Sequence, residues 1–378
     1  MENYQIVDAL NDVLMYLKKI FVSKDDIIDL MGICLAGREN LFLLGPPGTA
    51  KSAMVHELAN LLHGKTFEYL LTRFTEPNEL FGPFDIRKLR EGELITNTDG
   101  MLPEANLIFL DELLNANSAI LNSLLMILNE RVFRRGRENK NLPVLMIIAA
   151  SNHLPEDEAL HALFDRFLIR VQCDNVDPVL LSEVLESGWM LEKKETGNLP
   201  KISSEEILQL QKMVTNIDIK EIRPQYIELI QKLRNAGVKI SDRRAVKLQR
   251  LISASALLCQ RTKANPSDMW VLRYIWDTEE QREIITGIVN TEIEKTKEEN
   301  AHPRAYINDA PNADEIYKEV VSMKEKWENP ETTMVERASI KDRLRYLNGR
   351  TYWLINEVQR VYVQKGIDEL WNKIILEH

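Results

Sequence analysis

Cysteine, glycine, proline and long apolar runs are all scarce in this chain of 378 residues. Cys34, Cys173 and Cys259 are too few and too widely spaced for a disulfide framework or a metal-binding pattern, so we expect buried thiols. The low glycine and proline content excludes collagen-like and low-complexity classes. The longest clean apolar run, residues 144–150, is far shorter than the ~20 residues that span a bilayer. Because the chain also opens without a secretory pattern, we expect a cytoplasmic protein with no membrane span.

Positive charge is also in short supply. The chain has 48 lysines and arginines against 58 aspartates and glutamates, which gives a formal net charge of −10. That balance disfavours a globally basic nucleic-acid binder and leaves only a local basic groove for such a role. The rest of the composition, 44% hydrophobic and 28% charged, is typical of a soluble globular protein of two or three domains.

The first 175 residues predict an α/β domain. Short apolar runs alternate there with helix-length segments such as 52–62 and 118–129. The apolar runs are residues 41–44, 67–71, 107–110, 144–150 and 167–171. This alternation favours a parallel sheet with helices on both faces, because strands that are buried on both sides read as continuous apolar runs.

The rest of the chain is predicted to be helical. Strand-like runs disappear from about residue 176, and helices over 203–275 are expected to break near Pro224, Gly237 and Pro266. The charged segment 291–315 is expected to be an exposed connector. Beyond it, alternating spacings of four and three predict a helical seam made by Ile340, Leu344, Leu347, Thr351, Leu354, Val358 and Val361.

A glycine-rich phosphate loop is the strongest local signal. It consists of Gly45, Pro46, Pro47, Gly48, Thr49, Ala50, Lys51 and Ser52. An apolar run precedes it and a helical pattern follows, which is the strand–loop–helix context that the motif requires. Backbone N–H groups and the helix N-terminus would surround a phosphate there, with Lys51 between the β- and γ-phosphates and Ser52 on Mg²⁺. Ala50 stands where glycine is usual, and alanine adopts a positive φ only at a cost.

Acidic and polar side chains follow two further apolar runs. Asp111 and Glu112 end the run at 107–110, an arrangement in which the first acid holds Mg²⁺ and the second activates the attacking water. Two such carboxylates favour a hydrolase that turns over rather than a nucleotide switch. Asn152 ends the next run, beside the strand that carries Asp111, where it would orient the water near the γ-phosphate.

Several arginines are candidates for phosphate contacts, because the planar guanidinium stabilises spread phosphate charge. Arg166 follows Asp165 before the last apolar run and would serve a neighbouring subunit's nucleotide; the alternatives are a salt bridge to Asp165 or a helix cap. Arg243 and Arg244 open a helix, from which one of them would reach back to the γ-phosphate unless the pair is only a solvated helix start. Arg131 is left open between an interface role and a surface role.

Together these motifs resemble, in order and spacing, the AAA+ ATPases, and more finely the MoxR branch with its RavA group. The supporting segments are residues 45–52, 72–74, 79–83, 102–105, 120–122, 129–131, 149–152 and 241–244. The resemblance covers about residues 5–275 and includes the alanine at position 50. Residues 290–378 carry no motif that matches.

The resemblance implies a fold and a domain organisation. The AAA+ core would be an αβα sandwich with a five-stranded parallel sheet over residues 1–175. An all-α lid would follow over 176–290, and a C-terminal helical extension over 291–378. Residues 84–101 fall where this branch carries an insert in its second helix, a hairpin that faces the pore of a ring, and the two glycines of this segment suit turns there.

The resemblance also implies roles for individual residues. Lys51 and Ser52 correspond to Walker A, Asp111 and Glu112 to Walker B, Asn152 to sensor 1, Arg166 to the arginine finger, and Arg243 or else Arg244 to sensor 2. Phe21 and Val22 resemble the part that packs on adenine, and Ala53 continues the nucleotide-binding motif.

Competing functions follow from the resemblance. The leading one is Mg²⁺-dependent ATP hydrolysis, with ATP or ADP bound between the subunits of a ring, usually a hexamer. Such a ring would remodel protein clients as a chaperone does and work with a von Willebrand factor A domain partner. The alternative is a nucleic-acid translocase, which Arg87, Lys88 and Arg90 near the insert keep open and the net charge of −10 disfavours. Metal insertion of the magnesium-chelatase type is less favoured, because nothing suggests a porphyrin site.

Overall fold

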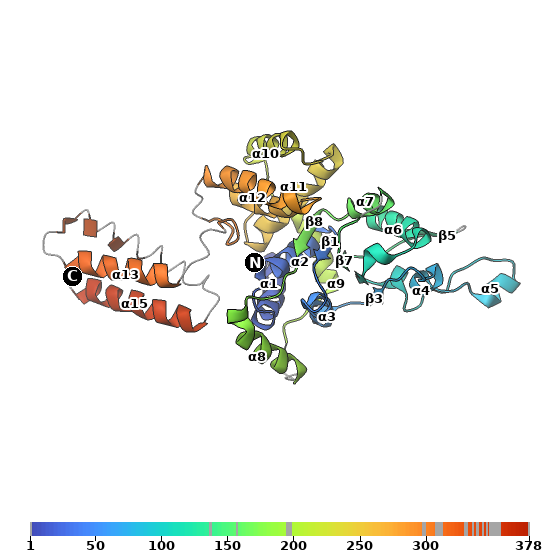
Figure 1. Ribbon diagram of the computed structural model, residues 1–378, viewed down its shortest axis with the longest axis horizontal. Helices are drawn as coiled ribbons and strands as arrows, with labels where there is room; N and C mark the ends of the chain where they lie inside the picture. The colour runs from blue at the N-terminus through green and yellow to red at the C-terminus, as the bar shows by residue number, and fades with distance from the viewer. Residues whose placement is uncertain are drawn as a thin grey trace. The chain divides into compact units, whose positions relative to one another are not determined.

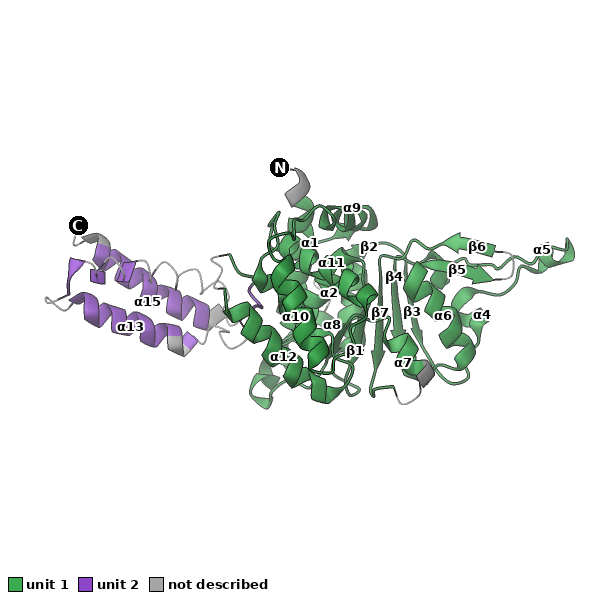
Figure 2. Ribbon diagram, turned by 90° about the horizontal axis from the view of Figure 1, so that it is seen from above, with its two compact units in different colours: residues 1–302 green, residues 303–378 purple. Residues whose placement is uncertain are grey.

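The computed structural model shows a chain made of two compact units, residues 1–302 and residues 303–378 (Figure 2). The residues that it describes are 2–135, 138–155, 158–193, 199–296, 300–306, 313–328, 332–334, 336–337, 340–341, 344, 347 and 357–376. The predicted domain boundaries at 175 and 290 are finer than this division and stay predictions. Among the described helices, none is long and apolar enough to cross a membrane.

A five-stranded parallel sheet forms the centre of the first unit, as the sequence predicts (Figure 2). Its strands, in spatial order, are β3 (Thr66–Leu70), β4 (Leu107–Asp111), β7 (Met146–Ser151), β1 (Leu41–Leu44) and β8 (Ile169–Gln172). β1 and β7 are buried along their whole length, as expected for a sheet with helices on both faces. Because the strands are parallel, their C-terminal ends share one edge of the sheet, the carboxyl edge, and their N-terminal ends share the amino edge.

In the described residues before the lid, seven helices of at least seven residues pack on the sheet or on one another (Figure 1). They are α1 (Glu2–Ile20), α2 (Asp25–Gly37), α3 (Lys51–Leu61), α6 (Ser118–Glu130), α7 (Glu158–Phe164), α8 (Leu181–Glu192) and α9 (Ser204–Val214). α2 is almost wholly buried and contacts both β1 and β8. α6 begins after Asn117, whose side chain accepts hydrogen bonds from the backbone N–H groups of Ala119 and Ile120. This cap fixes the start of α6 near the carboxyl edge, from which the helix returns to the amino edge.

A helical layer, the lid, follows in the chain. It contains α10 (Arg223–Asn235), α11 (Asp242–Leu258), η4 (Pro266–Tyr274) and α12 (Glu279–Glu294). The breaks occur where they are predicted: Pro224 lies in the first turn of α10, Gly237 has a φ of +88° before α11, and Pro266 opens η4. α11 packs on α2, so the lid rests directly on the part of the chain that holds the sheet.

The insert at 84–101 forms an arm between the short helices α4 (Pro77–Phe81) and η1 (Leu102–Glu104) (Figure 1). The arm itself contains α5 (Ile86–Arg90). An antiparallel bridge between Phe84 and Thr96 brings the two sides of the arm together. Gly92 and Gly100 have φ values of +82° and +72°, so both lie at the turns expected for them. Two further short helices are η2 (Leu113–Asn115) after β4 and η3 (Pro178–Leu180) before α8.

Three features of the first unit differ from the sequence-based expectations. β2 (Leu62–His63) pairs with β9 (Ile202–Ser203), so strands do not end at residue 176. The hairpin of β5 (Val132–Arg135) and β6 (Glu138–Asn141) is not predicted, because β6 is wholly polar and has no apolar alternation. His302, inside the segment expected to be exposed, is buried, and its ring stacks on Trp270 with the centroids 4.8 Å apart.

The second unit has its own apolar core between α13 (Ala313–Glu328) and α15 (Glu357–Leu376). The first three seam residues, Ile340, Leu344 and Leu347, are buried in this core as predicted. The seam prediction is wrong at Val361, which is 61% exposed. α15 instead turns inward the apolar residues Val363, Ile367, Leu370 and Ile374, a register two residues later that fits the same periodicity. Thr351, Leu354 and the side chain of Val358 lie outside the described residues.

Candidate nucleotide-binding site

The phosphate loop leaves the carboxyl edge at the end of β1, in the middle of the sheet. The Gly45 N–H donates to the Ser151 carbonyl at 3.1 Å, which ties the start of the loop to the end of β7. A Cβ on Gly45 would lie 2.1 Å from the Cys173 carbonyl oxygen, so only glycine fits this close approach to the end of β8. Gly48 and Ala50 have φ values of +82° and +64°, and the loop therefore curls back on itself before α3 begins at Lys51.

The Lys51 ammonium lies inside this curl. Its Nζ donates to the carbonyls of Gly45 and Pro46 at 2.7 and 2.8 Å, and the residue is buried. The hydroxyl of Thr49 also donates to the Pro46 carbonyl, at 2.9 Å. These contacts hold one positive charge at the start of a helix whose first N–H groups face the loop, which is the arrangement that binds phosphate.

Ser52 and Asp111 meet beside the loop. The Ser52 hydroxyl donates to Asp111 Oδ2 at 3.2 Å, across the gap between the start of α3 and the end of β4. Hydroxyl and carboxylate oxygens are suitable ligands for Mg²⁺, which usually takes only one or two protein carboxylates and completes its shell with water and substrate phosphates. Among the described residues, no group of three or more histidine, cysteine, aspartate or glutamate side chains could hold a metal ion.

Glu112 occupies an unusual backbone position beside this pair. Its φ of +50° is in the left-handed region, and its N–H donates to Asp111 Oδ1 at 3.0 Å. The Asn115 amide donates to Glu112 Oε2 at 3.4 Å, so the carboxylate is held by its own turn. A strained conformation that the surroundings maintain is common at functional sites.

Asn152 and the segment at Phe21 and Val22 also reach the carboxyl edge. Asn152 is exposed and directly follows Ser151, the residue bonded to the start of the loop. Phe21 is buried and Val22 half-buried, two residues before Lys24. The Lys24 ammonium donates to the Asp174 carbonyl, next to the close contact between Cys173 and Gly45.

Lys24 is a feature of this site that sequence reasoning misses, because no motif includes it. It is buried, and desolvation lowers its pKa from the usual lysine value. Burial also raises the pKa of the Cys173 thiol to about 12. Cys173 is therefore a neutral packing residue, as expected for the cysteines of this chain.

Arg166 lies at the opposite edge of the sheet from the phosphate loop. Its backbone carbonyl accepts a hydrogen bond from the Asn40 amide at 3.1 Å, and Asn40 directly precedes β1. The chain from Asn40 to Gly45 is extended and spans about 16 Å at ~3.3 Å per residue. Arg166 cannot cover that distance to the loop of its own chain. Its guanidinium meets only the neighbouring Asp165, at 3.1 Å, among the ion pairs of the described residues.

Arg243 and Arg244 differ in what they contact. Arg244 is buried and donates to the carbonyls of Lys239 and Ile275 and to Asp277, so the lid itself occupies its guanidinium. Arg243 is exposed and donates to Asn129 Oδ1 at 3.1 Å, at the C-terminal end of α6.

Asn129 places Arg243 at the amino edge. The Leu128 carbonyl, one residue earlier, accepts a hydrogen bond from the Asn40 amide at 3.4 Å. The same amide donates to the Arg166 carbonyl. Arg243 therefore lies at the edge that carries Arg166 and does not reach back to the loop of its own chain.

Arg131 has neither of the roles left open for it. It is buried and donates to Asn40 Oδ1 at 2.6 Å, where burial lowers its pKa to about 10. It is a structural residue that holds the start of β1.

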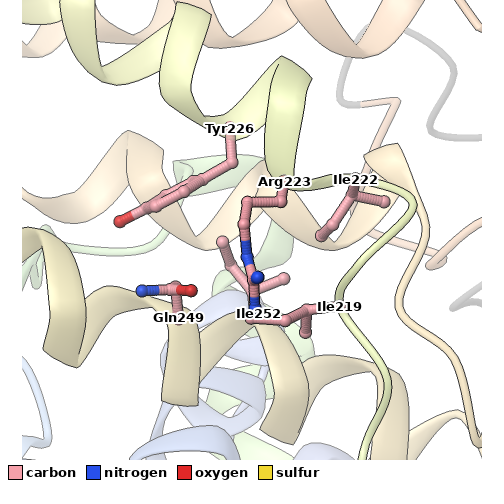
Figure 3. A pocket seen from close by; sticks show the side chains of 6 residues that line it. All are labelled: Ile219, Ile222, Arg223, Tyr226, Gln249 and Ile252. Atoms are coloured by element: carbon pink, nitrogen blue, oxygen red, sulfur yellow. The ribbon is translucent and has the colours of Figure 1, made fainter.

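A small hollow in the lid is separate from these residues. Figure 3 shows its lining, which consists of Ile219, Ile222, Arg223, Tyr226, Gln249 and Ile252. Its empty volume, open solvent included, is about 180 Å³. It contains no residue of the phosphate loop and is no part of the nucleotide site.

Comparisons with known proteins agree with this geometry. Residues 8–212, more than half of the chain, match the family described as the MoxR domain in the MoxR-vWA-beta-propeller ternary systems, and residues 216–289 match an AAA lid domain. An uncharacterised protein of Methanocaldococcus jannaschii is 33% identical over 293 residues, 75% of this chain and 74% of that protein. The chaperone MoxR1 of Mycobacterium tuberculosis is 24% identical over 56% of this chain and 55% of its own length.

A crystal structure of a candidate ATPase from Cytophaga hutchinsonii has the same fold. It superposes with a TM-score of 0.63 at 19% identity, covering 78% of this chain and 96% of that one. The phosphate loop, the acidic pair at the end of β4 and the matches to both the core and the lid lead to one conclusion: the chain belongs to the MoxR family of AAA+ ATPases.

Proposed function

We propose that this ATPase is active as a ring of identical subunits, in which each nucleotide is bound by one subunit and completed by the next. The observation that carries the proposal is the separation of its functional residues. Lys51, Asp111 and Glu112 lie at the carboxyl edge, whereas Arg166 lies at the amino edge. A second copy that presents its amino edge to the first would bring the arginine to the phosphates. A head-to-tail contact of this kind closes into a ring when the rotation allows it.

The residues at the carboxyl edge would divide the work of hydrolysis. Lys51 would bind the β- and γ-phosphates, and Glu112 would take a proton from the attacking water that Asn152 orients. Mg²⁺, held by Ser52 and Asp111, would neutralise the phosphate charge. Arg166 of the neighbouring subunit would stabilise the charge that spreads over the γ-phosphate in the transition state. Gly45, Gly48 and the backbone up to Ala53 would surround the phosphates, and Phe21 and Val22 would contact the base.

We further propose that hydrolysis drives the remodelling of protein clients together with a partner that contains a von Willebrand factor A domain. The matching family is described from systems that contain such a domain, and one relative is named a chaperone. The motifs quoted from the sequence also favour the RavA group within the family. A ring of six subunits is the stoichiometry we expect.

A nucleic-acid translocase is the competing function. The arm at 84–101 carries Arg87 and Arg90 on the exposed helix α5. Lys88 is already paired with Glu91 at 2.9 Å, which reduces the positive charge that this arm offers to a phosphate backbone. With a net charge of −10, the chain favours protein clients.

The first experiment measures the ATPase rate per subunit against protein concentration, with the mass followed by light scattering, with and without single-stranded DNA. We expect the rate to rise as oligomers form and to ignore the DNA. A rate that is independent of concentration in a monomer would contradict the ring, and strong stimulation by DNA would favour the translocase.

A further inference from the structure

Arg170 is a charged residue in the middle of a buried strand. It lies in β8, four residues after Arg166, and its side chain has no solvent exposure. Burying a guanidinium is costly unless several acceptors surround it. Its acceptors therefore show which segments the side chain holds together.

The two Nη atoms of Arg170 bind two different parts of the molecule. Nη2 donates to the Phe164 carbonyl at 3.1 Å, at the end of α7 and two residues before Arg166. Nη1 donates to the carbonyls of Ile275 and Trp276 at 3.1 and 2.7 Å and to Asp277 Oδ1 at 2.6 Å, all just after η4 of the lid. The fork of the guanidinium thus bridges the turn that carries Arg166 and the lid.

Arg244 completes this bridge from the lid side. It lies in the first turn of α11, donates to Asp277 Oδ1 at 3.3 Å and comes within 3.9 Å of Asp165. One carboxylate, Asp277, therefore holds two buried arginines, and burial together with the charge of Arg244 lowers the pKa of Arg170 to about 9. Arg243, the residue before Arg244, is fixed by the same contacts at the start of α11.

We propose that Arg170 is a positioning residue for ATP hydrolysis, which fastens the Arg166 turn to the start of α11 so that each subunit presents Arg166 and Arg243 to its neighbour as one rigid pair. The inference rests on the ring proposed above. It assigns Arg170 no contact with the nucleotide, since the residue is fully buried at the sheet. Its effect would come through the placement of Arg166, and a displacement of about 1 Å in a catalytic group can cost about 10²-fold in rate.

The test variant is Arg170→Lys. Lysine keeps the charge and most of the volume, but its single ammonium cannot bond to Phe164 and to the lid in the fixed fork geometry. We expect kcat to fall roughly 10²-fold with little change in KM, because the phosphate loop of the same subunit stays intact. Arg261→Lys is the matched control, since Arg261 makes an equally short pair with the buried Asp268 inside the lid, away from Arg166.

Mixed oligomers separate positioning from damage to the fold. Arg170→Lys subunits keep the base Glu112 but misplace Arg166, whereas Glu112→Gln subunits lack the base but place Arg166 correctly. Mixing the two should raise the rate above the sum of the separate rates, while mixing Arg170→Lys with Arg166→Ala should not. Arg261→Lys should behave as the wild type in both mixtures. If the mixture with Glu112→Gln gives no increase, Arg170 acts on its own subunit's loop and the inference is wrong.

Two further measurements keep this test decisive. Mixing Arg166→Ala with Glu112→Gln subunits tests the ring alone. If the ATPase rate of this mixture does not rise above the sum of the separate rates, the proposed function and this inference are both wrong. If it rises while the mixture of Arg170→Lys with Glu112→Gln does not, only this inference is wrong. If Arg170→Lys unfolds, Asp277→Asn replaces it. Asp277→Asn keeps an acceptor oxygen but loses the charge that holds Arg170 and Arg244 together, so the same pattern of mixtures is expected.

Discussion

Ala50 adopts a backbone conformation that its neighbours in the phosphate loop require. Its φ of +64° is left-handed, where an alanine costs about 1–2 kcal/mol relative to the right-handed region. The sequence identifies the anomaly, because glycine is usual at this position, but only the structure gives the dihedral angle. Glu112 likewise has a φ of +50°, which nothing in its sequence context indicates.

Replacing Ala50 therefore tests the loop geometry. In Ala50→Gly the relief of the left-handed strain is offset by ~0.4–1 kcal/mol of extra entropy in the unfolded chain. We expect a free energy of unfolding within about 1 kcal/mol of the wild type or slightly above it, and retained ATPase activity. Ala50→Val should lose stability, because a β-branched residue strongly disfavours this φ. Urea unfolding measures the free energy of unfolding of both variants. Equal values for Ala50→Gly and Ala50→Val would argue against a left-handed backbone at residue 50.

Glu112→Gln tests the assignment of the base. The amide keeps the shape of the side chain but cannot take a proton, so we expect normal ATP binding and a rate lower by about 10²–10⁴-fold. The control is Glu205→Gln on the exposed surface of α9, which should leave the rate unchanged. Equilibrium binding of a labelled nucleotide and single-turnover hydrolysis give the two quantities. Normal turnover by Glu112→Gln would show that another group accepts the proton.

At the scale of elements, the strands of the main sheet are predictable because they are buried on both faces and read as apolar runs. Short or polar elements escape this rule. β9 has only two residues, and β6 consists of polar side chains paired with β5. Helix periodicity predicts an apolar seam that runs from Ile340 to Val361, but it does not settle the register at the end of the seam, which explains the exposed Val361. The sequence also cannot decide between Arg243 and Arg244. Adjacent residues on a helix face different directions, and only the packing of the helix shows which of the two points inward.

The start of α11 gives a prediction that separates these two arginines. Arg244→Ala leaves Asp277 and the carbonyls of Lys239 and Ile275 without a buried partner, so we expect a loss of about 3–5 kcal/mol in the free energy of unfolding. Arg243→Ala removes an exposed side chain and should cost less than about 0.5 kcal/mol. If Arg243 contacts the neighbour's nucleotide, its ATPase rate should nevertheless fall. Denaturant unfolding gives the stability of each variant, and the ATPase rate shows whether Arg243 contributes to hydrolysis. Two equally stable variants would contradict the buried role of Arg244.

At the scale of the whole molecule, the candidate site is divided between two edges of one sheet. The motifs predict the polar residues proposed to act at the carboxyl edge, since each follows an apolar run or lies within the loop, but they miss Lys24. Phe21 and Val22 follow from the family resemblance alone. What they cannot predict is the distance between the two sets of residues. That distance follows from the strand order and from the contacts of Asn40, which link residues far apart in the chain.

Arg166 of one subunit is proposed to act at the phosphate loop of another. The most direct test is the ATPase rate of an equal mixture of Arg166→Ala and Glu112→Gln subunits, each of which should be nearly inactive alone. Random assembly places an intact Glu112 beside an intact Arg166 of the next subunit at about a quarter of the head-to-tail interfaces. We therefore expect the mixture to hydrolyse ATP at about that fraction of the wild-type rate. A mixture no faster than its two components would contradict this proposal.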